Sequence, residues 1–263
     1  MPRFPIALLA SCFTVAALTG PAAAQALDLT LLRRALKPLA VNGVLKSRST
    51  FQMTGEKQGV SFTFHEEASI LAKRPGKFRA DVIQFAAGGA PERRLLVVSD
   101  GSKVWTCRPY QRQYSVTTAK AFQAANADMT ALGLAQGGFF LGDGHAMAQG
   151  FATITQANSP QAMAMLGNMG IHLTGKPQTV NGETLFVFRL VLIKQGVVYR
   201  FFVDPETAAL RQMELTGQQN GVTIAFRETI SSLRSPAHVP KTTFHFTPSR
   251  DMVKVAALSA DPF

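Results

Sequence analysis

The histidines and the acidic residues next to them are where metal binding or acid–base chemistry would be expected. The chain has five histidines, at His65, His145, His172, His238 and His245. No two of them have the i, i+4 spacing that places zinc ligands on one helical face. His65 is followed by Glu66 and Glu67, but neighbours in a strand point to opposite faces, so we expect these three at the surface. The pattern predicts no metal site and no cofactor.

The thiols and glycine-rich stretches give no stronger indication of catalysis. Cys12 and Cys107 are the only cysteines, too few for a zinc site built from four thiolates. A nucleophilic thiol needs a nearby base and a lowered pKa, whereas Cys107 stands in a strand-like run and is expected to be half-buried. Gly142-Asp143-Gly144 is not followed by Gly-Lys-Ser/Thr, and no Gly-x-Ser-x-Gly motif occurs. The sequence therefore indicates a protein that is not an enzyme.

The amino-terminal segment has the organisation of an export signal. Arg3 is followed by an uncharged apolar stretch and then by Gly20-Pro21-Ala22-Ala23-Ala24, the order found in cleaved secretory peptides. We expect residues 1–24 to be removed and a periplasmic chain to start near Gln25. Leu9-Ala10-Ser11-Cys12 also has the spelling of a lipobox. The alternative is therefore an outer-membrane lipoprotein anchored through a lipidated Cys12.

The charge balance is basic but sparse. The 263 residues include 27 Lys and Arg against 16 Asp and Glu, and charged residues make up 16% of the chain, which argues against a disordered polyelectrolyte. The basic residues alternate with acids along strand-like segments, so nucleic acid is not an expected partner. Residues 45–120 carry 13 basic and 6 acidic residues. This excess favours peripheral contact of a monomer with anionic lipid headgroups.

Hydrophobic periodicity predicts one helix followed by many strands. Residues 28–40 carry leucines at helical spacing, with basic residues on the other side. Alternation over residues 60–65 and 77–82 is typical of half-buried strands. Tight hairpins are expected at Asp100-Gly101, Asn181-Gly182 and Asn220-Gly221. We count roughly 10–12 antiparallel strands, the last at residues 242–247, in a single domain over residues 25–263.

The interval 121–170 differs from the strands around it. It has no Lys or Arg, two acidic residues and five of the nine methionines. Its apolar side chains would be exposed in a solvated linker, so we expect a helical lid or plug over an apolar surface. Methionine adapts to variable apolar shapes, which would suit a lid that moves. The lid candidates are Met129, Phe139, Phe140, Met147, Met163, Met165 and Met169.

Three stretches together resemble the bacterial outer-membrane lipoprotein carrier superfamily, of the LolA/LolB type. They are SILAKRPGKFRADV at residues 69–82, VSDGSKVWTCRPYQRQYSV at residues 98–116 and TTFHFTPSRDMVKV at residues 242–255. The second is the most specific, because it combines an Asp-Gly turn, a Lys-x-Trp strand and a Pro-containing hairpin. The order of the motifs and the helix before them fit an uncharacterised periplasmic branch of this superfamily.

The resemblance implies a mainly β fold with α: an antiparallel, incomplete (half) β-barrel covered by a helical lid. Acyl chains would bind between the sheet and the lid. It also implies that the Arg of the Lys-Arg-Pro motif, Arg74 in this chain, holds the lid closed. The chain departs from the superfamily at Pro248-Ser249-Arg250, where members commonly have Pro-Pro-Gly. Its lid region is also long and rich in methionine.

Transfer of an acyl chain from the membrane into water costs roughly 0.8 kcal/mol of free energy per methylene. We therefore expect a carrier that moves acylated lipoproteins or other lipid cargo from an inner-membrane donor complex to an outer-membrane acceptor. The alternative is an envelope regulatory or sensor module that binds a protein partner on the same fold. The cavity candidates are Phe62, Phe64, Phe78, Val82, Trp105, Tyr199, Phe201 and Val203. Alternation alone does not separate a cavity lining from a filled core.

Overall fold

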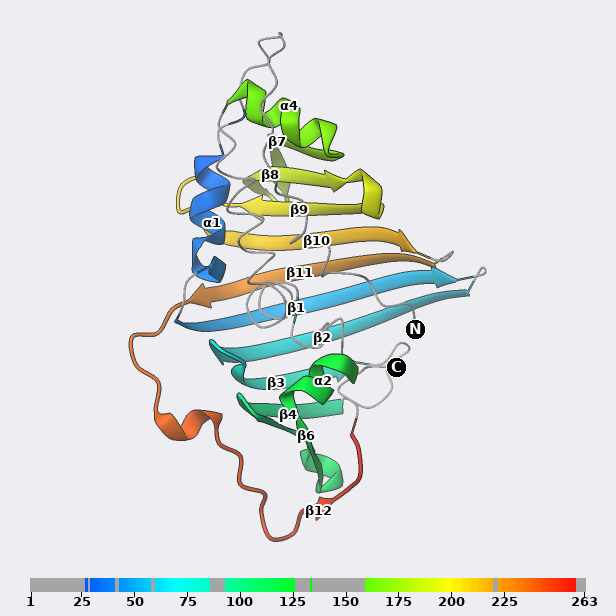
Figure 1. The fold of residues 1–263 in the computed structure, drawn as a ribbon, viewed down its shortest axis with the longest axis vertical. Coiled ribbons are helices and arrows are strands. Elements are labelled where there is room, and N and C mark those ends of the chain that lie inside the picture. Colours follow the sequence, from blue (N-terminus) through cyan, green and yellow to red (C-terminus); the bar gives the residue numbers. More distant parts are fainter. Residues whose placement is uncertain are drawn as a thin grey trace.

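The computed structural model describes residues 27, 29–40, 43–57, 60–85, 93–125, 133, 159–219 and 222–258 (Figure 1). Residues 1–24, expected to be an export signal, and Cys12 lie outside the described residues, as do Asn220-Gly221 and the lid candidates Met129, Phe139, Phe140 and Met147. Within the described part of the chain, no helix is both long and apolar enough to cross a membrane.

Twelve strands form one open sheet in the order β12-β6-β5-β4-β3-β2-β1-β11-β10-β9-β8-β7. The strands of the first half are β1 Val44–Lys57, β2 Val60–Lys73, β3 Lys77–Phe85, β4 Arg93–Asp100, β5 Lys103–Arg108 and β6 Gln113–Thr118. Those of the second half are β7 Ile171–Val180, β8 Glu183–Leu192, β9 Val197–Val203, β10 Leu210–Gln219 and β11 Val222–Arg234. The short strand β12, Val253–Lys254, pairs with β6 at the outer edge of the first half. The pairing is antiparallel except between β12 and β6. The open antiparallel sheet expected from the sequence is confirmed.

Each half of the sheet is a run of sequential neighbours, and the pairing of β1 with β11 joins them. The tight turns between strands follow from residues that tolerate positive φ. Gly101 lies at φ +97° between β4 and β5, and Asn181 and Gly182 lie at φ +51° and +84° between β7 and β8. These two hairpins are confirmed. Asn181 and Gly182 have the two positive φ values of a tight Asn-Gly turn, whereas the β4–β5 connection is a four-residue loop between Ser99 and Val104 in which only Gly101 has positive φ.

The closing segment differs from the sequence expectation. Residues 242–247 were expected to form a strand, but the chain makes the 3₁₀ helix η6, Lys241–Phe244, and rejoins the sheet only at β12. Prolines at 240 and 248 bracket this segment, and proline cannot donate a hydrogen bond to a β ladder. The segment packs against β3 and β4 instead of extending the sheet.

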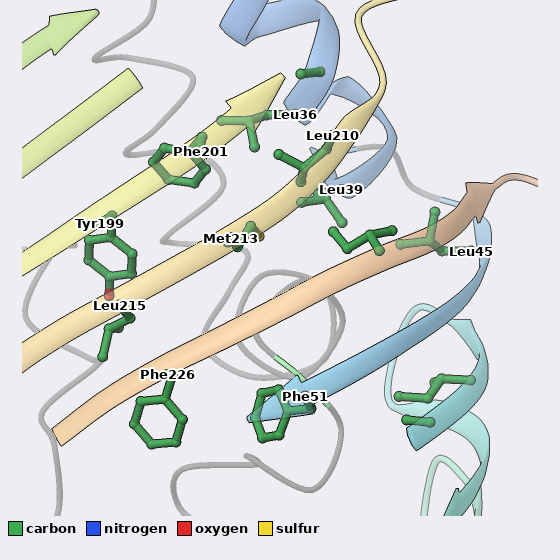
Figure 2. Close-up of a cluster of buried hydrophobic side chains, with 14 of the residues drawn as sticks. Leu36, Leu39, Leu45, Phe51, Tyr199, Phe201, Leu210, Met213, Leu215 and Phe226 are labelled. Atoms are coloured by element: carbon green, nitrogen blue, oxygen red, sulfur yellow. The ribbon is translucent and has the colours of Figure 1, made fainter. Parts of the chain in front are cut away.

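Within the described residues, three α-helices accompany the sheet: α1 Thr30–Ala40, α2 Ala119–Ala125 and α4 Pro160–Asn168. Leu32, Leu36 and Leu39 of α1 are buried at helical spacing, as expected for residues 28–40, while the basic residues of the helix are exposed. Leu36 and Leu39 lie over β9 and β10, close to Phe201 and Leu210 (Figure 2). We call the face of the sheet that α1 packs against the covered face, and the opposite one the outer face.

Candidate functional site

The covered face is a continuous apolar surface built by alternation in both halves of the sheet. Phe64 of β2, Phe78 and Val82 of β3, and Tyr199, Phe201 and Val203 of β9 belong to one buried cluster that also contains the leucines of α1. The rings of Tyr199 and Phe201 stack with centroids 6.2 Å apart. Figure 2 shows these two side chains beside Met213, Leu215 and Phe226 of the neighbouring strands. Six of the eight cavity candidates therefore share one face.

Two cavity candidates are not placed there. Trp105 of β5 pairs with Val98 on the outer face, whereas its neighbour Val104 belongs to the cluster on the covered face. Its ring lies 6.2 Å from that of His245 and 6.5 Å from that of Phe246, both in the closing segment. The assignment of Trp105 to the cavity is therefore wrong, because η6 and the residues after it cover this part of the outer face. Phe62 lies in β2, and its side chain is outside the described part of the structure.

The described end of the interval 121–170 packs on the covered-face cluster. Helix α4 begins after Ser159, whose hydroxyl accepts a hydrogen bond from the Ala162 N–H at 3.1 Å, a typical N-cap. Met163 and Met169 are partly buried against the cluster, and Met165 is half-buried on the same helix. On the other side of the interval, the ring of Phe122 in α2 lies 6.0 Å from that of Phe78. Helices α2 and α4 thus both cover part of this face.

Arg74, directly after β2, contacts the end of helix α1. Its Nη2 donates to the carbonyl oxygen of Leu39 at 3.1 Å, and its Nη1 donates to that of Ala40 at 3.4 Å. The last carbonyls of a helix have no partner within the helix and carry the negative end of its dipole. A guanidinium, with its five donors and permanent charge, suits this position. Arg74 is thus placed to fasten α1 to the sheet.

The covered face also carries polar residues that we expected at the surface or did not single out. Glu66, expected to be exposed, is fully buried, and so is Glu228 of β11. Both face Phe51 of β1, one from each side. Burial raises the pKa of Glu66, and the nearby charge of Glu228 raises it further, although a hydrogen bond from Gln84 acts in the opposite direction. The centre of the apolar face therefore holds two carboxyl groups.

The sequence contains a pattern that indicates buried positions for these two carboxyl groups. Glu66 follows Phe62 and Phe64 at period 2 and precedes Ala68 and Ile70, and Glu228 stands in the same way between Phe226 and Ile230. An acidic residue at an inward position of an alternating strand is a buried-charge candidate. The prediction that His65, Glu66 and Glu67 all lie at the surface is therefore wrong for Glu66, whereas His65 and Glu67 are exposed.

The outer face has a different character. The described residues line a groove of about 360 Å³ on it, with Arg48, Glu67, Asp81 and Arg94 among the lining side chains. Arg94 and Asp81 form a two-pronged ion pair with N–O distances of 2.9 and 2.6 Å. This groove combines charged side chains with apolar ones such as Ile83, and unlike the covered face it is not a continuous apolar surface.

Neither face of the described structure has side chains arranged to bind a metal ion or to activate a thiol. No three His, Cys, Asp or Glu side chains among the described residues are grouped to hold a metal ion. Cys107 is a free, buried thiol in β5, and burial raises its pKa. A raised pKa lowers the thiolate fraction on which nucleophilic reactivity depends.

The chain is similar to known proteins in structure but not in sequence. No family profile and no curated protein matches the chain. Solved structures that it is similar to include LprF from Mycobacterium bovis, at 11% identity over 81% of this chain and 95% of that one, with a TM-score of 0.40.

A LolA superfamily protein from Nitrosomonas europaea matches at 10% identity over 83% of this chain and 97% of that one, with a TM-score of 0.30. The MucA/MucB complex of Pseudomonas aeruginosa matches at 14% identity, over 84% of this chain and 61% of that one, with a TM-score of 0.35.

Proposed function

We propose that this protein is a periplasmic carrier, without enzymatic activity, that binds acyl chains of lipoproteins or other envelope lipids against its covered face. The observation that carries the proposal is the apolar surface that spans both halves of the open sheet, with helices rather than a second sheet packed on it. Burial of hydrocarbon is non-directional and proportional to area. Such a surface can therefore accept chains of different length without specific polar contacts.

A carrier must also release its cargo, which requires a cover with a small closing energy. Arg74 supplies two hydrogen bonds between the sheet and the last turn of α1, and hydrogen bonds to charged groups contribute roughly 1.5–3 kcal/mol each when well shielded. Arg74 is only half-buried, so its contribution lies at or below the low end of this range. A cover fastened in this way could open and close on binding.

Arg74→Leu is expected to speed the release of a bound acyl probe about fivefold. This factor corresponds to a loss of ~1 kcal/mol in the energy that holds the cover closed. Release of a fluorescent fatty-acid analogue, followed by stopped flow, measures the rate. Urea unfolding of the same variant should show a loss of about 1 kcal/mol or less. Lys73→Leu, at the exposed neighbouring position, is the matched control. Equal release rates for wild type and Arg74→Leu would show that Arg74 does not fasten the cover.

Native mass spectrometry of protein purified from an exporting host tests the proposal as a whole. We expect a lipid mass bound to part of the sample and an amino terminus near Gln25. A chain that keeps a diacylated Cys12 would support the anchored-acceptor alternative. Lipid-free protein recovered with a stoichiometric protein partner would contradict the carrier and favour the sensor module.

A further inference from the structure

A row of polar side chains crosses the centre of the covered face. On β1, Phe51 faces Glu66 of β2 and Glu228 of β11. Ser49, the next inward residue of β1, faces Ala68 and Ile230, the adjacent inward positions of the same two strands. Ser49 therefore lies between the strands that carry the two carboxyls. Because β1 and β2 are the longest strands and lie mid-sheet, this row is in the middle of the proposed acyl site.

Several polar atoms of this row are not satisfied by the protein. The Oε2 atom of Glu66 accepts a long hydrogen bond from Gln84 Nε2 at 3.4 Å, while its Oε1 atom has no partner. The hydroxyls of Ser47 and Ser49, on the same face of β1, are also buried and without a partner. Native structures leave few buried polar groups unpaired, since each one is destabilising by roughly 1–3 kcal/mol. Three such atoms on two adjacent strands indicate a binding function.

The charges around the row favour a cation over an anion. Among the described residues, the covered-face positions of β1, β2, β3 and β11 hold two glutamates near the middle of the strands, and the only Lys or Arg in the same alternation is Lys57, the last residue of β1. Gly133, in the interval 121–170, approaches one of these glutamates. At Gly133, which has φ +70°, an added Cβ would lie 2.6 Å from Oε1 of Glu228. The carboxyl group of Glu228 thus lies next to the backbone of Gly133.

We propose that Ser49, Glu66 and Glu228 bind the cationic amine of an amphipathic ligand whose hydrocarbon chain lies along the covered face. This inference rests on the proposed acyl-binding function and names the polar group that accompanies the chain. An ammonium group has three donors, which match Oε1 of Glu66, the Ser49 hydroxyl and the Glu228 carboxyl. In an apolar environment, an ionised carboxyl attracts such a cation far more strongly than in water. Amine binding is therefore expected to release the proton that burial favours on Glu66, whereas a fatty-acid carboxylate gains no such attraction.

Titration of the full mature chain with dodecylammonium, dodecanol and dodecanoate, below their micelle concentrations, tests the inference. The three ligands share one chain and differ in the polar end. In calorimetry at neutral pH, the wild-type protein should bind the amine about tenfold or more tightly than the alcohol, the effect of one charged hydrogen bond. Glu66→Gln combined with Glu228→Gln should remove this preference and leave dodecanol affinity within about threefold. The control Glu67→Gln, on the outer face of β2, should keep it.

The outcomes separate the two levels of the proposal. Equal affinity for all three ligands, or a preference for dodecanoate, overturns the amine site and leaves acyl binding standing. A preference for the amine that persists in the double variant places the site elsewhere and also overturns it. Failure of all three ligands to bind overturns both the amine site and the proposed function. The comparison among ligands on the wild-type protein requires no variant to fold.

Discussion

Phe201→Ala is expected to lower the free energy of unfolding by about 3–5 kcal/mol, the usual loss for truncation of a buried phenylalanine. Phe201 has no exposed surface and lies between Phe188 of β8 and Met213 of β10 on the covered face. Leu36 of α1 lies close above it (Figure 2). Because sheet and helix backbones hold these neighbours apart, the space left by the ring is only partly refilled. Urea unfolding monitored by circular dichroism measures the loss.

The control for this variant is Tyr110→Ala, since Tyr110 is 76% exposed and its truncation should change stability by less than about 0.5 kcal/mol. A loss below about 1 kcal/mol for Phe201→Ala would mean that the covered face is not packed as described.

The same variant also tests whether Phe201 lines the proposed acyl site or belongs only to the hydrophobic core. If Phe201 contacts bound acyl chains, the folded variant should bind dodecanol more weakly than wild type, and unchanged affinity would assign Phe201 to the core alone.

Glu66→Gln is expected to raise the free energy of unfolding by about 1–3 kcal/mol at pH 8, the range for a buried polar group that lacks full hydrogen bonding. Burial raises the pKa of Glu66 in the folded protein. The folded state therefore retains a proton that the unfolded chain has lost, and wild-type stability falls as pH rises above the ordinary glutamate pKa. Glutamine has no proton to lose. The gain should consequently be small near pH 4 and grow with pH.

Urea midpoints for wild type and Glu66→Gln, measured at intervals from pH 4 to pH 8, give this dependence. Glu67→Gln serves as control, because Glu67 is exposed on the outer face of the same strand. A gain that does not change with pH would show that Glu66 does not titrate in this range. Because Glu66 interacts with Glu228, the titration midpoint belongs to the pair rather than to one residue.

The stability gain expected for Glu66→Gln and the loss of amine preference expected for the double glutamine variant both bear on why the carboxyl pair is present. A group that lowers stability at neutral pH contributes nothing to the packing of the sheet, and an apolar residue of similar size would pack there without an unpaired oxygen. Sites that bind ligands commonly reduce stability in this way. A stability gain in Glu66→Gln together with a loss of amine preference would therefore assign the pair to binding.

Local patterns in the sequence were enough to predict the helix at residues 28–40, the number and direction of the strands and the hairpins at Gly101 and Gly182. Helical spacing, period-2 alternation and positive φ are properties of a few neighbouring residues, so they can be read without the fold. The segment 242–247 shows the limit of this reasoning. Its alternation predicts a strand, but prolines at both ends and packing against β3 and β4 direct it elsewhere.

Only the tertiary structure decided which side of each strand is covered. Alternation divides Trp105 from Val104 and Glu66 from Glu67, but it does not say which of the two faces α1, α2 and α4 will cover. That choice depends on contacts between segments far apart in the chain, such as Arg74 with the end of α1 and Trp105 with Phe246. Such contacts made Glu66 an inward carboxyl and Trp105 an outward ring, because burial is a property of the packed molecule rather than of the strand.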